Sequence, residues 1–577
     1  MPSEIAIDEE DAYFREYPID ADFIEQAEYI AETDFLALTA EHPDEQSIIR
    51  RLTTGGAKLL VGPRGCGKTT LMLKAYYSLI RDRQIRSIPI YVNFKLSLKL
   101  EPLYVNTPNA TFWFRQWLNL KIYEGLWRSI EEFGDFVVPA SLASKKSVLS
   151  AIRSLESGVV DTKRDVSSFS IEELSENIVE VLEANGMARC VLLLDDAAHA
   201  FSPRQQEDFF EFFRQIKSRE ISPKAAIYPG ITTHSPTFHV GHDAEQIDVW
   251  IRPDRLGYIE FMTDLAEKRF RGVLPSTLIN TPSAIPFLAY ASFGIPRSFL
   301  NMLRTIYHEQ ESQPDASNVD RRRLLDIAKQ SRESAHNVYD SLANKIPAYR
   351  EFVGTGNDLY QQMMSYLKNY NKFRDEENQA LSIGLKRPIP PEMDKVLSFF
   401  QYAGLLMPAG ENSRGVKGTF DIYMVHFGDL ITENAIIGRR AKSIVSFVAA
   451  FGAQTHQAWP RLSPASLVSP TQYPTLFRLT LPHCQQCGAE RANEHARFCQ
   501  NCGAPLKTAS LYEELTNQDI SVLPLSRRIV TRIKKNSRIR TIKDILIDTD
   551  RSKLRSIRYI GPVRAARIAS YAEEYVA

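Results

Sequence analysis

The sequence has few cysteines, no long apolar run and no excess of charge of either sign. Four of its six cysteines lie between residues 484 and 502, which excludes a disulfide framework spread over the chain. No apolar run reaches the ~18–20 residues of a membrane span, and the acidic N-terminus lacks the pattern of a signal peptide. We therefore expect a cytoplasmic protein without a membrane partner.

The balanced net charge hides a difference between the two ends of the chain. Residues 1–34 contain twelve Asp or Glu and one Arg, whereas residues 527–567 contain fourteen Lys or Arg and three Asp. A basic segment of this kind is typical of a surface that binds nucleic acid. With 577 residues, the chain is also too long for one hydrophobic core, and we expect three to five domains.

One eight-residue segment matches the phosphate-binding pattern G-x-x-x-x-G-K-[ST]. The matching residues, with the threonine that follows them, are Gly62, Pro63, Arg64, Gly65, Cys66, Gly67, Lys68, Thr69 and Thr70. Glycines let the backbone N–H groups form a concave nest for anionic oxygens. Lys68 would reach the β- and γ-phosphates, and the Thr69 hydroxyl would complete the shell of a Mg²⁺ ion. An apolar run at 57–61 and helical spacing over 70–80 provide the strand and helix that this loop requires.

Two carboxylates follow a second apolar run, residues 190–194. Such a run is typical of a central parallel strand, and ligands bind beyond the carboxyl ends of such strands. Asp195 would hold Mg²⁺, and Asp196 takes the place of the acid that polarises the attacking water. An Asp is one methylene shorter than a Glu, which predicts slow hydrolysis or a switch. The alternative is a strand that ends in a solvated turn.

Two weaker patterns follow. Residues 225–234 fit a third strand whose terminal polar group senses the γ-phosphate, with Thr232, Thr233 or His234 as candidates. The segment 293–300 predicts a helix that begins near Pro296, which would direct Arg297 at a phosphate. A surface arginine is the alternative interpretation of Arg297.

Taken together, the phosphate loop, the strand ending in Asp-Asp, the sensor strand and the G-x-P-R segment resemble AAA+ ATPases of the origin-recognition and initiator type. They also resemble the related signal-transducing ATPases with numerous domains. The resemblance covers roughly residues 45–312 and implies that Thr232 is the first sensor and Arg297 the second. It also implies oligomers whose sites are completed by an arginine of a neighbouring subunit. Arg219, Arg252 and Arg255 are candidates.

The segment after this region predicts a winged helix, as in initiator-type proteins. An amphipathic pattern over 393–400 indicates a helix, and the segments 406–408 and 419–425 could pair as a hairpin. The basic turn 414–418 could contact DNA phosphates, or the module could serve packing alone. The Pro-, Ser- and Thr-rich stretch that ends at residue 481 is typical of a linker.

A zinc ribbon is predicted by two C-x₂-C pairs with eleven residues between them. The four predicted ligands are Cys484, Cys487, Cys499 and Cys502. Each pair is followed by a glycine that permits the tight turn, and four thiolates close the shell of a tetrahedral Zn²⁺. A segment this short would depend on the metal to fold. The site is expected to be structural or partner-binding because no ligand position stays open.

The basic C-terminal segment contains a helix, a glycine turn and a second helix, the pattern of a helix-hairpin-helix element. The turn and the following helix N-terminus would meet a DNA phosphate. The stretch 520–568 resembles the C-terminal domain of the bacterial RNA polymerase α subunit. That resemblance puts Arg528 in the place of the minor-groove arginine and Gly561 in that of the backbone-contacting turn. Val563 and Arg564 replace the family's Lys and Ser, and Arg564 is a further candidate DNA contact. A basic solvated face or a protein-docking module is the alternative.

The predicted architecture is a multidomain α/β protein with a P-loop AAA+ parallel sheet. We expect seven segments: an acidic segment (1–45), the ATPase core (46–250), a helical lid (251–312), a winged helix (313–435), a helix and linker (436–481), a zinc ribbon (482–507) and an all-α helix-hairpin-helix module (510–577).

Three functions are compatible with these patterns. The first is a Mg²⁺-dependent ATPase of low turnover that forms homo-oligomers and acts as a nucleotide-dependent switch on DNA. The second is a signalling ATPase of an antiphage defence or mobile-element system, whose C-terminal modules bind a protein trigger or effector. The third is a non-enzymatic, transcription-linked adaptor whose nucleotide site is inactive. The intact Lys68 and Asp195 argue against this function. ATP, Mg²⁺ and Zn²⁺ are the expected cofactors.

Overall fold

The structure is a computed structural model, and it describes most of the chain. The described residues are 27–95, 100, 110–156, 169–196, 203–272, 274–312, 317–375, 378–436, 443–452, 459–481, 483–484, 486–491, 496, 498–504, 506, 515–523, 525, 527–548 and 551–576. Most of the predicted acidic segment, residues 1–26, lies outside them. Among the described residues, no helix combines the length and the apolarity needed to cross a bilayer.

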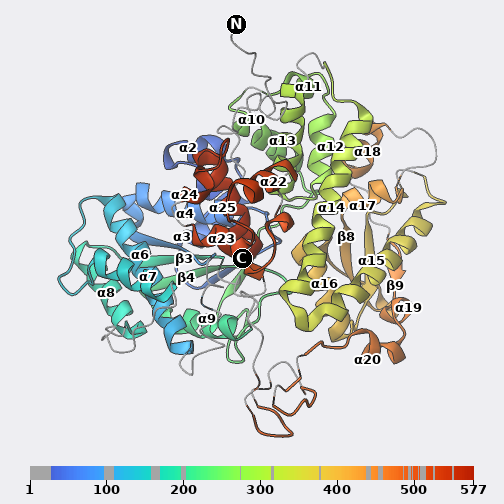
Figure 1. The fold of residues 1–577 in the computed structure, drawn as a ribbon. Coiled ribbons are helices and arrows are strands. Elements are labelled where there is room, and N and C mark those ends of the chain that lie inside the picture. The colour runs from blue at the N-terminus through green and yellow to red at the C-terminus, as the bar shows by residue number, and fades with distance from the viewer. Residues whose placement is uncertain are drawn as a thin grey trace.

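A five-stranded, all-parallel sheet forms the centre of the N-terminal half (Figure 1). Its strand order is β2-β3-β4-β1-β5. The strands are β1 (Lys58–Val61), β2 (Ser87–Asn93), β3 (Arg189–Asp195), β4 (Ile221–Ile227) and β5 (Glu245–Asp248). β1, which leads into the phosphate loop, therefore lies between β4 and β5, and β3, which carries the carboxylates, lies one strand further along. The predicted multidomain α/β fold with a parallel P-loop sheet is confirmed.

Helices cover both faces of this sheet, so its strands are buried on each side. One face packs against α6 (Ala110–Phe133), α7 (Lys145–Glu156), α8 (Ile171–Ala184) and α9 (Pro203–Ile216), and the other against α2 (Glu32–Leu38), α3 (Glu45–Thr53) and α4 (Lys68–Arg81). Successive side chains of a strand point to opposite faces. In β3, Leu192 and Leu194 belong to the α6–α9 side, and Val191 and Leu193 to the α4 side. The same alternation turns Asp195 toward α4.

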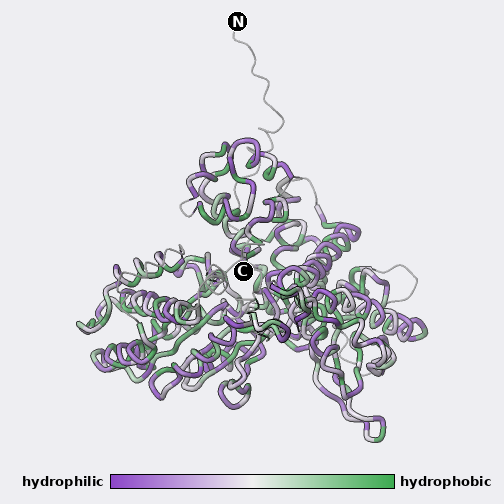
Figure 2. The backbone as a smooth tube through the Cα atoms, turned by 60° about the horizontal axis from the view of Figure 1, so that its bottom comes forward, coloured by the Kyte–Doolittle hydropathy of each residue, from purple (hydrophilic) through white to green (hydrophobic). Residues whose placement is uncertain are grey.

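The segment predicted as a lid and the following unit share one hydrophobic core. The helices of the predicted lid segment are α10 (Tyr258–Arg269), α11 (Ser276–Ile279), α12 (Ala284–Ala291) and α13 (Pro296–Ser312). The next helices are α14 (Arg321–Lys345), α15 (Arg350–Asn371), α16 (Pro391–Ala403), α17 (Phe427–Thr432), α18 (Ile444–Gly452), α19 (Pro464–Leu467) and α20 (Tyr473–Leu476). Figure 2 shows hydrophilic and hydrophobic positions alternating along the peripheral helices, as expected where one helix face is buried.

A second sheet lies within this unit, with the strand order β7-β8-β6-β9. Its strands are β6 (Ser382–Lys386), β7 (Leu406–Ser413), β8 (Thr419–Val425) and β9 (Arg461–Leu462). β7 and β8 form an antiparallel hairpin from Leu406↔Val425 to Ser413↔Thr419. The helix and the hairpin predicted from the sequence are therefore present, in the order α15-β6-α16-β7-β8.

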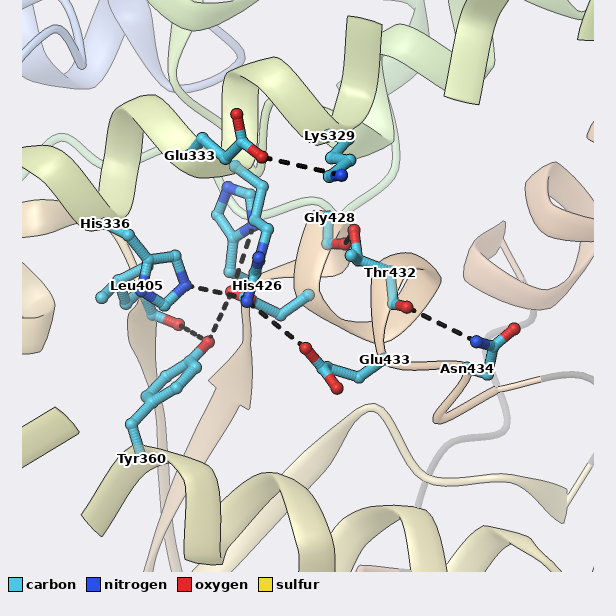
Figure 3. Close-up of polar contacts among 12 residues, drawn as sticks. Lys329, Glu333, His336, Tyr360, Leu405, His426, Gly428, Thr432, Glu433 and Asn434 are labelled. Carbon is cyan, nitrogen blue, oxygen red and sulfur yellow. Dashed lines mark hydrogen bonds and ion pairs between the residues drawn. The ribbon is translucent and has the colours of Figure 1, made fainter. Parts of the chain in front are cut away.

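A buried polar network ties α14, α15 and α17 together (Figure 3). Asp429 is fully buried and accepts from Arg332 Nε at 2.5 Å, from the Tyr360 hydroxyl at 2.8 Å and from His336 Nε2 at 2.9 Å. His426 Nδ1 lies 3.7 Å from the same carboxylate. These partners hold the pKa of Asp429 at about 2 despite its burial, and burial lowers the pKa of His426 to about 4.

The C-terminal residues form a small helical module. Its helices are α22 (Arg527–Asn536), α23 (Ile542–Ile547), α24 (Ser552–Arg555) and α25 (Pro562–Val576). The predicted helix, turn and helix correspond to α24, residues 556–561 and α25. Tyr559 adopts a positive φ of 72° in this turn, and Ala565 N–H donates to the Gly561 carbonyl as α25 begins.

Candidate nucleotide and zinc sites

The phosphate loop joins β1 to α4 and has the backbone of an anion-binding nest. Gly65 and Gly67 have φ angles of 85° and 99°, which lie in the left-handed region that favours glycine. Gly67 is the N-cap of α4, so the first N–H groups of a 14-residue helix face the loop. The N-terminus of α13 packs directly on this loop, because Arg297 N–H donates to the Gly65 carbonyl at 3.3 Å. A Cβ at Gly65 would lie 2.9 Å from the Cβ of Arg297.

Lys68 is folded into its own loop. Its Nζ lies 2.8 Å from the Gly62 carbonyl oxygen and 3.0 Å from that of Pro63. The same atom lies 3.8 Å from the centre of the Tyr228 ring, a cation–π distance. Only 5% of Lys68 is exposed, and burial lowers the pKa of its amine. Its charge is therefore satisfied within the loop.

The two carboxylates at the end of β3 lie beside this lysine and the loop threonine. Asp195 accepts hydrogen bonds from the Thr69 and Tyr91 hydroxyls, the latter at 2.8 Å. Burial, and then the charge of Asp196, raises the pKa of Asp195 to about 7. Asp196 has a positive φ of 51° and accepts from the Tyr228 hydroxyl at 2.8 Å.

A cavity of about 1070 Å³, its open mouth included, is lined by Lys68, Thr69, Asp196 and Tyr228, and Asp195 lies outside its lining. Its polar lining includes Thr39, Glu45, Arg64, Gly65, Cys66, Gly67, Lys68, Thr69, Thr70, Lys74, Asp196, Tyr228, Arg269 and Arg297. Its apolar part is lined by Ala40, Ile251, Phe261, Leu265 and Leu300, together with His42. A cavity with a cationic and an apolar part has the character that a nucleotide needs, because the phosphates and the base differ in polarity.

The chain near the described N-terminus closes one rim of the cavity. Glu28 bonds to Lys95 Nζ at 2.9 Å and to Asn93 Nδ2 at 3.3 Å, so the short helix at 27–29 is held to the carboxyl end of β2. Glu28 and Lys95 both line the cavity. The sequence carries no local signal for this contact, because a lone Glu and a lone Lys lie 67 positions apart.

The predicted third strand is wrong at its C-terminal end. β4 ends at Ile227 rather than continuing to His234, because Pro229 cannot donate to a ladder and Gly230 turns the chain with a φ of 73°. Tyr228 is therefore the first residue after the strand, and it lines the cavity. The Thr232 hydroxyl instead donates to the Tyr228 carbonyl at 2.8 Å and accepts from its N–H. The strand-breaking Pro-Gly pair was the signal that could have identified Tyr228.

Most of the remaining candidate residues of the ATPase region do not line the cavity. Thr233 N–H donates to the Gln206 side chain, and His234 packs against Phe210 and Phe238. Among the candidate trans arginines, Arg252 pairs with Asp254 and Arg255 with Asp44 of its own chain, and Arg219 is exposed. The cavity thus includes Arg297 but none of these five residues.

The four predicted zinc ligands meet in one cluster. Their Sγ atoms lie within 4.8 Å of one another, at 3.6 Å for Cys484–Cys502 and 3.5 Å for Cys487–Cys499. Tetrahedral ligands at 2.3 Å from Zn²⁺ lie about 3.8 Å apart. Each pair forms the same tight turn, since Gly488 and Gly503 donate to the carbonyls of Cys484 and Cys499 with φ angles near 70°. These residues fit a Zn²⁺ ion.

The candidate DNA-binding residues share the C-terminal module. Arg528 is exposed in the first turn of α22. The Arg564 guanidinium turns back onto the hairpin and donates to the Tyr559 carbonyl at 2.9 Å. Two further guanidinium groups lie at cation–π distance from the centre of the Tyr559 ring, those of Arg532 at 4.9 Å and Arg558 at 4.8 Å.

Comparisons with known proteins return similar structures. No protein-family model and no curated protein sequence matches the chain. A Walker-type ATPase of Pyrococcus abyssi is similar at 13% identity and a TM-score of 0.37, over 68% of this chain and 97% of that one. The Aeropyrum pernix ORC1 protein, solved in complex with DNA, is similar at 16% identity and a TM-score of 0.28, over 70% and 94%. Cdc6p from Pyrobaculum aerophilum is similar at 12% identity and a TM-score of 0.28, over 73% and 99%.

Proposed function

We propose that the chain is an ATP-binding AAA+ ATPase of low turnover that acts as a nucleotide-dependent switch on DNA. The observation that carries the nucleotide site is the convergence of Lys68, Thr69 and Asp195 at the carboxyl edge of the parallel sheet, beside a cavity with a cationic and an apolar part. The loop N–H groups and the N-terminus of α4 would hold the phosphates. Arg64 of the loop and Arg297 of α13 would add positive charge.

The same residues suit a Mg²⁺ ion. The Thr69 hydroxyl and the Asp195 carboxylate already share a hydrogen bond, so their oxygens lie close enough to serve one hard cation. Bound Mg²⁺ would neutralise charge on the transferred phosphoryl group. Asp196 would orient the attacking water as a general base.

Two features support slow turnover. Asp196 reaches less far than a Glu, and one of its oxygens accepts from Tyr228. The Lys68 amine must also break its hydrogen bonds to two carbonyl oxygens and its cation–π contact with Tyr228 before it can contact a phosphate. Both features make the resting site a poor catalyst and a suitable switch.

ATP binding by the full chain tests this proposal. We expect Lys68→Ala to abolish binding of ATP with Mg²⁺ in a calorimetric titration. Lys58→Ala is the matched control, since Lys58 begins the same β1 strand at its opposite end and pairs with Glu245 on the surface. Normal ATP binding by Lys68→Ala would refute the site.

The C-terminal module would carry the switch onto DNA as a homo-oligomer. Arg528 would contact the backbone or minor groove, and the Gly561 turn with Arg564 would contact a phosphate. Residues 313–435 would act as a winged helix, and a Zn²⁺-bound ribbon at 482–507 would connect the two parts. Duplex binding of the full chain should weaken steeply with salt. Salt-independent or absent binding would remove DNA as the partner.

A signalling ATPase whose C-terminal modules bind a protein effector, as in antiphage defence, is the second candidate. The packing of α16 beside the nucleotide site favours it, because Lys395 Nζ donates to the Gly230 carbonyl at 2.8 Å next to Tyr228. ATP turnover that ignores DNA would favour this candidate over the first.

A further inference from the structure

The Tyr228 side chain contacts the loop lysine, a β3 carboxylate and the following unit at once. It is 5% exposed and follows directly on β4. Its ring lies under Lys68 Nζ, and its hydroxyl donates to Asp196. Its backbone is fixed by the Thr232 hydroxyl, which bonds both the N–H and the carbonyl of Tyr228. The ring is therefore held in one place by three separate contacts.

Tyr228 also contacts α16. The rings of Tyr228 and Tyr402 meet edge to face, with centroids 5.8 Å apart. The turn after Tyr228 has no spare room against this helix, because a Cβ on Gly230 would lie 2.6 Å from the backbone carbon of Ser398. Lys395 of α16 bonds to the carbonyl of that glycine. The segment 228–230 is thus one of the surfaces against which α16 packs, beside α14, α15 and β7.

We propose that Tyr228 couples the nucleotide state of the phosphate loop to the docking of α16. This inference rests on the proposed nucleotide site and extends it to the regulation of the second unit. Without nucleotide, the Tyr228 ring holds Lys68 and supports Tyr402. When phosphate oxygens attract Lys68, the ring loses its cation, the loop and Asp196 rearrange, and α16 loses part of its support.

The coupling has a physical basis in competition for the same groups. A ligand shifts a conformational equilibrium only by its differential interaction with the two states. The phosphates compete with the Tyr228 ring for the Lys68 amine, and groups bound near the γ-phosphate compete with the Tyr228 hydroxyl for Asp196. Each competition is absent when the site holds no triphosphate, so the two states differ in these contacts.

Two variants separate the ring from the hydroxyl. Tyr228→Leu removes the ring, so Lys68 no longer has to break a cation–π contact before it binds a phosphate. The free energy of that contact predicts about 2- to 30-fold tighter binding of a non-hydrolysable ATP analogue with Mg²⁺. Tyr228→Phe keeps the ring and removes only the bond from the hydroxyl to Asp196, so any gain in affinity of this variant measures the competition for Asp196 and not that for Lys68. A gain in affinity is an effect that partial unfolding would not produce.

Hydrogen exchange of the full chain measures the response of α16. We expect the ATP analogue to speed exchange of residues 391–403 in the wild type. In Tyr228→Leu that exchange should already be fast without nucleotide and should no longer respond. Tyr91→Phe is the matched control: it removes a tyrosine hydroxyl from Asp195, which Tyr91 contacts from β2, and should leave α16 responsive.

The outcomes distinguish this inference from the proposed function. If the wild type binds the analogue through Lys68 but Tyr228→Leu binds no more tightly, the coupling is refuted and the nucleotide site stands. An α16 exchange rate that ignores nucleotide in the wild type would refute the coupling as well. If the wild type binds no analogue, both proposals fall.

Discussion

Replacing Asp429 by Asn should destabilise the unit that follows the lid. Asp429 is fully buried, and it accepts from Arg332, His336 and Tyr360, which come from two different helices (Figure 3). Lowering its pKa from 3.8 to about 2 corresponds to about 2 kcal/mol in favour of the charged form. Removing one partner of a buried ion pair costs about 3–5 kcal/mol. Because the Asn amide can keep part of the network, we expect a loss of about 2–4 kcal/mol.

Native-state hydrogen exchange is the suitable assay, because a multidomain chain has no single free energy of unfolding. The expected loss corresponds to protection of residues in α15 and α17 that falls about 30- to 1,000-fold. Asp421→Asn is the matched control in the same unit. Asp421 pairs with Arg387, which is half exposed, and such surface pairs contribute about 0–1 kcal/mol. Equal, small effects of both substitutions would refute the reasoning.

Three further predictions concern pH, zinc and DNA. The pKa of His426 is about 4 in the folded chain, below its ordinary value of 6.5. Between pH 4 and 6.5, His426 is therefore protonated in the unfolded chain but not in the folded one. The free energy of opening of the unit that contains α15 and α17, measured by hydrogen exchange, should therefore fall by up to ~3 kcal/mol as the pH drops from 6.5 to 4. A free energy of opening that stays constant over this pH range would contradict the prediction. Elemental analysis should find one Zn²⁺ per chain, lost in Cys487→Ser and kept in Cys190→Ser, whose cysteine lies within β3. Arg528→Ala should reduce the salt slope of duplex binding by about 1, whereas Arg478→Ala, which removes an exposed arginine outside the module, should leave it unchanged.

The parts of the fold that depend on local patterns could be predicted from the sequence. The glycine spacing of the phosphate loop, the apolar run before Asp195 and the two C-x₂-C pairs each encode a structure within a few residues. The strand, helix and cysteine cluster at these positions are where the patterns place them. The helix that begins at Pro296 was predictable for the same reason, because proline favours the first helical position.

The parts that depend on contacts between distant segments could not be predicted. Tyr228 meets Lys68 and Tyr402 only because β1, β4 and α16 converge in three dimensions. The network around Asp429 joins residues about 70 to 100 positions apart, none of which stands in a recognisable motif. The end of β4 was misplaced because apolar residues on both sides of Pro229 concealed the break in the strand.

The central claim, a nucleotide site built on the phosphate loop, is tested most directly by equilibrium binding of ATP with Mg²⁺ to the full-length wild type and to Lys68→Ala. We predict saturable binding of one ATP per wild-type chain and no detectable binding to the variant. Equal binding to both proteins, or none to the wild type, would contradict the site described here.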